Sequence, residues 1–134
     1  MSVFQNLMED LQKICEATNV NFEEIKKELE LVIGKEELVA YLFGQGMAPD
    51  NPNTVFDLLV IGQEHLFSLD KEKNGLNLSY DKLSKYSLSS IRKQENRIKF
   101  EMRQTGSLYQ FYLNNPKSEE SVVMDFYKKL REVL

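Results

Sequence analysis

The chain has 134 residues, of which 42% are hydrophobic and 28% are charged. This composition is typical of one globular domain with its own core, and it excludes a disordered polar chain. A net charge of −4 gives no overall electrostatic support to nucleic-acid binding. We expect a cytoplasmic protein, because the first residues do not have the pattern of a signal peptide and no apolar stretch approaches the ~18 residues of a membrane-spanning helix.

Two amphipathic helices are predicted at the start, in residues 2–17 and from Asn21 to about residue 34. Ser2 with Gln5, and Asn21 with Glu24, have the spacing of capping boxes, and a glycine at position 34 favours a helix end. The first helix has a broad apolar stripe, which predicts either docking on the same chain or self-association as a homodimer. The residues expected to associate are Val3, Phe4, Leu7, Met8 and Leu11.

Short strands are predicted in the middle of the chain. The apolar or alternating segments are 38–43, 55–61, 65–70, 76–80, a stretch within 85–91, 97–103 and 109–113. Asn74-Gly75 is a strong hairpin signal, and residues 44–54 have the glycine, proline and asparagine content of a loop. A last amphipathic helix is expected after Asn115-Pro116.

Three segments bring this order close to a known family: "GKEELVAYLFG", "VFDLLVIGQEHLFSLDKE" and "IKFEMRQTGSLYQFYLNN", the last leading into the helix "SEESVVMDFYKKLREVL". The pattern resembles bacterial pleckstrin-homology-like (PH-like) domains over residues 35–134, with residues 1–34 as an added helical segment. The resemblance implies an α+β fold, a PH-like antiparallel β-barrel capped by a C-terminal helix. It also implies a binding scaffold without chemistry. Phosphoinositide-binding members carry basic residues in the loop after the first strand, whereas "GQGMAPDNPN" has none.

The residues give no catalytic, cofactor or metal motif, and we predict no enzyme activity, no cofactor and no metal. Cys15 lies on the apolar stripe of the first helix and is expected to be a core residue. His65 is the only histidine, and no cysteine or acidic residue lies at metal-ligand spacing from it, which makes it a poor zinc candidate. Gly44-Gln45-Gly46 lacks the rest of a phosphate loop and is predicted to be a turn.

A basic segment is the main electrostatic feature. Seven lysines and arginines stand against two glutamates between positions 82 and 103. A solvated sheet face explains such a segment, and a docking surface for an acidic protein or for anionic lipid is the functional alternative. The candidate partner-binding residues are Lys82, Lys85, Arg92, Lys93, Arg97, Lys99, Arg103 and Tyr112.

We therefore predict a non-catalytic scaffold or adaptor that binds a protein partner of unknown identity, and no nucleic acid. A peripheral adaptor on an anionic membrane surface is one alternative. A dimeric chaperone-like protein that holds a partner segment on an exposed strand edge is the other.

Overall fold

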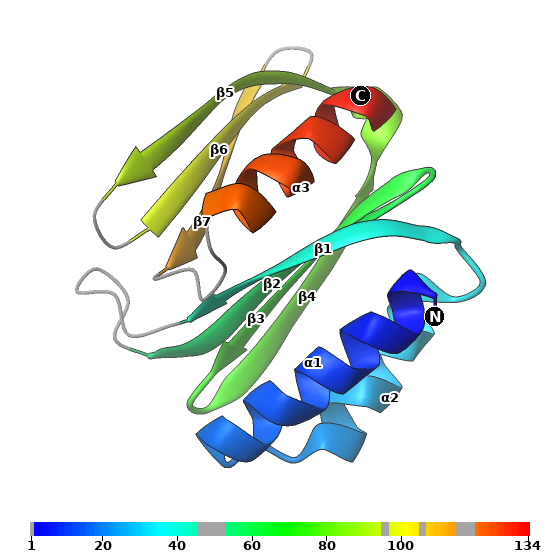
Figure 1. Cartoon of the computed structure of the whole chain (residues 1–134), viewed down its shortest axis with the longest axis vertical. Helices are drawn as coiled ribbons and strands as arrows, with labels where there is room; N and C mark the ends of the chain where they lie inside the picture. The colour runs from blue at the N-terminus through cyan, green and yellow to red at the C-terminus, as the bar shows by residue number, and fades with distance from the viewer. Residues whose placement is uncertain (1, 46–52, 95–96, 105–106, 115–119) are drawn as a thin grey trace.

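The computed structural model describes residues 2–45, 53–94, 97–104, 107–114 and 120–134. Two helices come first, then seven strands with one short 3₁₀ turn, then a last helix (Figure 1). The predicted α+β class is therefore confirmed. The elements are α1 (Val3–Thr18), α2 (Phe22–Ile33), β1 (Leu38–Gln45), β2 (Thr54–Gly62), β3 (His65–Glu72), β4 (Gly75–Lys82), η1 (Leu83–Lys85), β5 (Tyr86–Gln94), β6 (Arg97–Gln104), β7 (Ser107–Asn114) and α3 (Glu120–Val133).

Local sequence explains where the first two helices begin and end. The Ser2 hydroxyl accepts a hydrogen bond from the Gln5 amide, and the Gln5 side chain accepts one from the Ser2 amide, so the predicted capping box is confirmed. Asn21 caps α2 by accepting from the Glu24 amide at 3.2 Å. Asn19 and Gly34 end the helices with φ values of 58° and 61°, a region that asparagine and glycine tolerate best.

The strands form two antiparallel sheets, one ordered β1-β2-β3-β4 and the other β5-β6-β7. The predicted β-barrel is not closed: among the described residues no ladder joins β4 to β5, or β1 to β7. Cα atoms of β7 do lie within 8 Å of Cα atoms of β1 and of β2, so the second sheet contacts the first through β7. Closure depends on pairing between strands far apart in the sequence, which strand periodicity does not encode.

The first sheet is covered on both faces along β1 and β2, whereas β4 at its edge is largely exposed (Figure 1). Helices α1 and α2 cover one face, where Phe56, Leu58 and Val60 of β2 point. The other face, with Leu59 and Ile61, packs against α3 and the start of β5. Burial on both faces is why β2 is a nearly continuous apolar run in the sequence.

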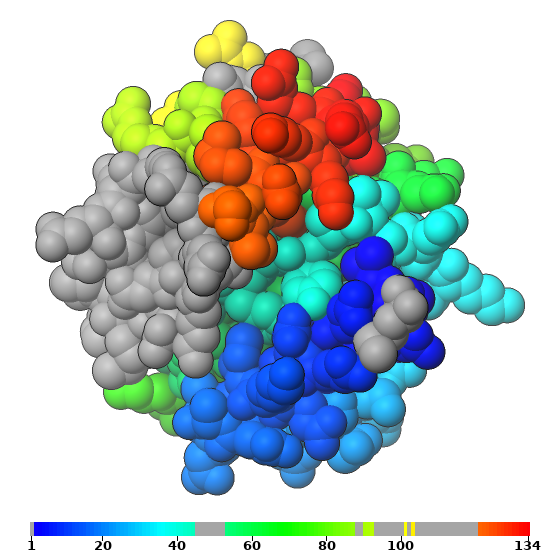
Figure 2. Space-filling model, in the orientation of Figure 1, coloured from blue at the N-terminus to red at the C-terminus, as the bar shows by residue number. Residues whose placement is uncertain are grey.

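The apolar stripe of α1 packs on its own chain. Leu7 and Leu11 are fully buried in the cluster that α1 shares with the sheet, and they are corrected from surface candidates to core residues. Val3, Phe4 and Met8 are partly buried against that cluster. A homodimer stays a prediction, and it would have to use these partly buried residues. In Figure 2, α1 and α3 lie on either side of the exposed part of β1.

Candidate functional site

The basic residues predicted to bind a partner lie in two places. Lys82 and Lys85 are exposed at the end of β4 and in η1, and Arg92 and Arg103 are exposed on β5 and β6. The strand register places Arg92 opposite Lys99, and Lys99 opposite Tyr112, so these three positions form one row across the second sheet. The side chains of Lys93, Arg97, Lys99 and Tyr112 lie outside the described part of the structure.

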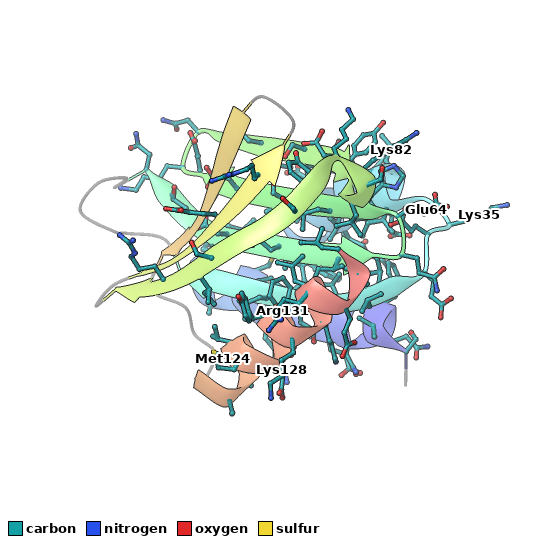
Figure 3. All side chains as sticks on the ribbon, turned by 90° about the horizontal axis from the view of Figure 1, so that it is seen from above. Lys35, Glu64, Lys82, Met124, Lys128 and Arg131 are labelled. Atoms are coloured by element: carbon teal, nitrogen blue, oxygen red, sulfur yellow. The ribbon has the colours of Figure 1, made fainter. Side chains whose placement is uncertain are left out.

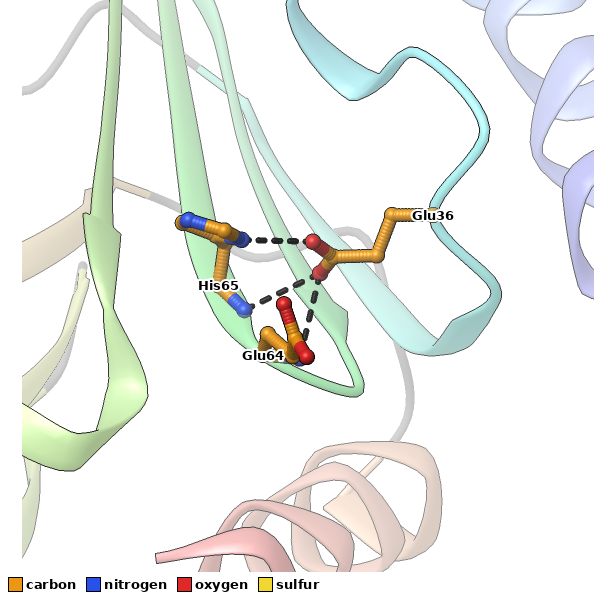
Figure 4. Close-up of side chains that lie close together, drawn as sticks. All are labelled: Glu36, Glu64 and His65. Carbon is orange, nitrogen blue, oxygen red and sulfur yellow. Dashed lines mark hydrogen bonds and ion pairs between the residues drawn. The ribbon is translucent and has the colours of Figure 1, made fainter.

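A second candidate site surrounds the only histidine, in the turn between β2 and β3. Glu36, in the segment before β1, places its carboxylate against this turn (Figure 4). Its Oε1 atom lies 2.5 Å from His65 Nδ1, and its Oε2 atom accepts from the amides of His65 at 2.9 Å and Glu64 at 3.3 Å. The Glu64 side chain comes close as well: one ligand atom each from Glu36, Glu64 and His65 lie within 4.8 Å of one another.

Gly62 makes the approach of Glu36 to this turn sterically feasible. A Cβ atom added at Gly62 would lie 1.7 Å from Glu36 Oε2, far inside van der Waals contact. The last residue of β2 is therefore a glycine for reasons of space. The side chains of Glu36 and His65 are only 14% and 22% exposed, so both are held in a partly desolvated position.

Aromatic contacts fix the other side of the histidine ring. His65 packs edge-on against Tyr80 of β4 with ring centroids 5.5 Å apart, and it lies 6.0 Å from Phe67 of β3. Tyr80 itself is 59% exposed. The ring of His65 is thus held between a carboxylate and an aromatic pair at one end of the molecule. Figure 3 shows Glu64, Lys35 and Lys82 at this same end.

A third candidate site is the groove between α2 and β4, with a volume of about 830 Å³. Its lining residues come from α2, from the β3–β4 turn and from the first half of β4. They are Glu24, Ile25, Lys27, Glu28, Val32, Lys71, Asn74, Gly75, Leu76 and Leu78. Among the described strands none pairs with the outer side of β4, so one wall of the groove is a strand edge left open by the described residues.

A smaller groove of about 250 Å³ lies between α1, β1 and α3. One of its lining residues, Tyr41 of β1, donates a hydrogen bond from its hydroxyl to Asp10 Oδ2 of α1 at 2.6 Å. Burial is the main cause, and this bond to a carboxylate the second, of a pKa of Tyr41 that is raised above its ordinary value. This contact ties α1 to the edge of the sheet.

Sequence reasoning missed both the histidine cluster and the groove. Glu36 and His65 are 29 residues apart, and no short motif connects them. The one local feature that could have indicated the cluster is the adjacent pair Glu64-His65, two residues after Gly62. Cys15 was predicted correctly: it is fully buried, and burial raises the pKa of its thiol.

Comparison with known proteins gives no family assignment. No protein-family model matches the chain, and a search of curated proteins finds no match either. In the described part of the structure, each helix is too short or too polar to cross a membrane. The functional proposal therefore depends on the geometry of these sites.

Proposed function

We propose that the chain is a non-catalytic, cytoplasmic protein-interaction module on a PH-like scaffold, and that it binds an extended segment of a partner protein along β4. The supporting observation is the open edge of β4 beside a groove with an apolar floor. Extended peptides bind such edges by adding a strand, where backbone hydrogen bonds supply affinity and alternate side chains supply specificity.

The hydrogen-bonding pattern of β4 supports this mode of binding. The Leu83 amide donates to the Glu64 carbonyl at 2.8 Å, next to the pair His65–Lys82 in the β3–β4 register. Hydrogen-bonded pairs recur at every second residue of an antiparallel ladder. Counting back by two from Leu83, the β4 residues that bond to β3 are the odd-numbered ones, so the backbone groups of Leu76, Leu78 and Tyr80 point away from β3, to the other edge of β4.

The side chains around the groove specify what kind of segment fits. Leu76 and Leu78 form an apolar floor with Ile25 and Val32. An added strand would therefore place apolar side chains at alternate positions on this floor. Leu31 of α2 is 79% exposed and follows Lys27 and Glu28 by four and three residues, so it continues the groove-facing side of the helix.

Charge then favours a basic segment. The Lys71 ammonium group donates to the carbonyls of Glu72 and Gly75, so it is already engaged within the β3–β4 turn. Glu24 and Glu28 outnumber Lys27 on the helical wall, and all three are exposed. The occupant is thus an extended protein segment with alternating apolar residues and one or two lysines or arginines.

The proposal can be tested by selecting a displayed library of random linear peptides on the full chain. We expect enrichment of peptides with alternating apolar positions and basic residues. Glu24→Lys combined with Glu28→Lys is expected to lower the affinity of the selected peptides for the chain by about 10-fold, since each exposed ion pair contributes up to ~1 kcal/mol. The matched control is Glu16→Lys with Glu132→Lys, which makes the same charge change at exposed positions of α1 and α3.

Two outcomes would reject the proposal. In one, backbone amide shifts on peptide binding map to β5 and β6 instead of to residues 76–80. In the other, the chain floats with phosphatidylglycerol vesicles in a salt-sensitive manner and the selection enriches no peptides, which would favour the membrane-surface adaptor.

A further inference from the structure

We propose that Glu36, Glu64 and His65 form a binding site for one divalent zinc-class metal ion, a property separate from peptide binding along β4. The site combines one imidazole nitrogen with two carboxylate oxygens, and these three ligand atoms lie within 4.8 Å of one another (Figure 4). Three protein ligands with a fourth position left to water is the arrangement of open zinc sites.

The donor set selects the class of metal. Calcium and magnesium prefer cages made of oxygen atoms alone, whereas imidazole suits zinc, copper and nickel. Two carboxylates and a histidine nitrogen, with no thiolate, are the ligands of a borderline ion such as Zn²⁺. The one cysteine of the chain, Cys15, is fully buried in the helix–sheet core and does not compete for the ion.

Two of the three ligands are held in position before any ion binds. The Glu36 carboxylate is fixed by the amides of His65 and Glu64 and fits over Gly62, which has no side chain. Tyr80 and Phe67 hold the His65 ring. Pre-organised ligands lower the ordering cost of binding, so only the exposed Glu64 side chain has to be immobilised.

Only a small movement is needed to admit the ion. His65 Nδ1 and Glu36 Oε1 are 2.5 Å apart, which is the distance of a short hydrogen bond between them. Metal–ligand distances near 2.0–2.1 Å in a tetrahedral site separate two ligand atoms by roughly 3.3 Å. The ring and the carboxylate would therefore move apart by under ~1 Å, with the ion in place of the hydrogen-bonded proton.

Charge at the site favours a cation as well. Glu36 and Glu64 bring two carboxylates together, and within the described residues the only ion pair at either of them is that of Glu36 with His65. Lys35 and Lys82 lie at the same end of the molecule without forming an ion pair there (Figure 3). A divalent ion between the carboxylates would offset their repulsion, and partial burial would strengthen that attraction.

The test titrates tag-free, chelator-treated full chain with Zn²⁺ against a fluorescent zinc indicator. One ion per chain is expected, and Co²⁺ should give the visible absorption bands of a four-coordinate site. His65→Gln is expected to weaken binding by more than the ~10–100-fold lost with an outer-shell partner, because it removes the nitrogen ligand itself. Glu64→Gln is expected to weaken it by about 10-fold, and this exposed residue can be changed without disturbing the bonds of Glu36.

Glu37→Gln is the matched control, since Glu37 is an exposed neighbour whose carboxylate accepts from the Gln63 side chain instead of facing the cluster. It should bind Zn²⁺ as tightly as the wild type. Equal Zn²⁺ affinity in the wild type and in Glu64→Gln would overturn the proposal and leave Glu36 as a structural cap of the turn. The same conclusion would follow if Co²⁺ gave only the spectrum of the hydrated ion.

Discussion

Replacing Gly62 with alanine tests whether the approach of Glu36 to the β2–β3 turn stabilises the fold. The new Cβ atom would lie 1.7 Å from Glu36 Oε2 and 2.6 Å from the carboxyl carbon, so the carboxylate must leave its place. Glu36 then loses its hydrogen bonds from the amides of His65 and Glu64, and its contact with the His65 ring. The substitution therefore tests the contact of Glu36 with the turn of Gly62, Glu64 and His65.

The size of the loss follows from these bonds. A hydrogen bond to a charged group contributes roughly 1.5–3 kcal/mol when buried. The amide bond from His65 is short at 2.9 Å and that from Glu64 is long at 3.3 Å, and water can reach the partly exposed carboxylate and replace part of both. We therefore expect a loss of about 2–3 kcal/mol in the free energy of unfolding, a large share of the ~5–15 kcal/mol of an ordinary domain.

Urea unfolding followed by circular dichroism would measure this loss as a fall of about 1 M in the midpoint. Gly75→Ala is the control, because nothing lies within 4 Å of a Cβ atom there, and its effect should stay within about 0.5 kcal/mol. Gly62→Ala should lower the free energy of unfolding much less in a Glu36→Ala background than in the wild type. If both backgrounds lose the same stability, the cost has another origin and the role given to Glu36 is refuted.

Three further predictions concern the helices and their contact with the sheet. Because the pKa of Tyr41 is raised in the folded state, the unfolded chain loses this proton first, so the contribution of Tyr41 to stability should be constant below about pH 10 and fall above it; Tyr41→Phe should reduce the loss of stability above about pH 10 in urea unfolding, where the buried Cys15 thiol adds a loss of its own. Leu29→Ala empties a fully buried site in the helix–sheet core and should cost about 2–5 kcal/mol, whereas Leu31→Ala, on an exposed face, should cost under ~0.5 kcal/mol. Asn21→Ala removes the cap of α2 and should cost about 1 kcal/mol in thermal or urea unfolding, and an unchanged midpoint would contradict the capping role.

Features with a short sequence range could be predicted. The capping box at Ser2, the end of α2 at Gly34 and the buried strand in residues 55–61 were all placed correctly. The hairpin signal at Asn74-Gly75 was also correct, although the register makes Lys73 and Asn74 the loop and starts β4 at Gly75. These features depend on backbone conformation and apolar periodicity over a few residues, which a single sequence does encode.

Features with a long sequence range could not be predicted. The cluster of Glu36, Glu64 and His65 needs Glu36 to reach a turn 29 residues away, and a glycine at position 62 to leave room for it. The open edge of β4 depends on which strand follows it in space, and β5 joins the second sheet instead. Periodicity shows that a strand has a buried face, but it does not identify its neighbour.

The burial of β2 on both faces makes the two layers that cover the first sheet depend on each other. Phe56, Leu58 and Val60 face α1 and α2, and Leu59 and Ile61 face α3, so every residue from 56 to 61 except Asp57 contributes to one of the two clusters. A fragment starting at residue 35 would keep the second cluster and expose the first, including Phe67 and Leu69. Such a continuous apolar face favours aggregation. The helices of residues 3–33 are therefore part of the sheet's core, and the groove between α2 and β4 exists only when they are present.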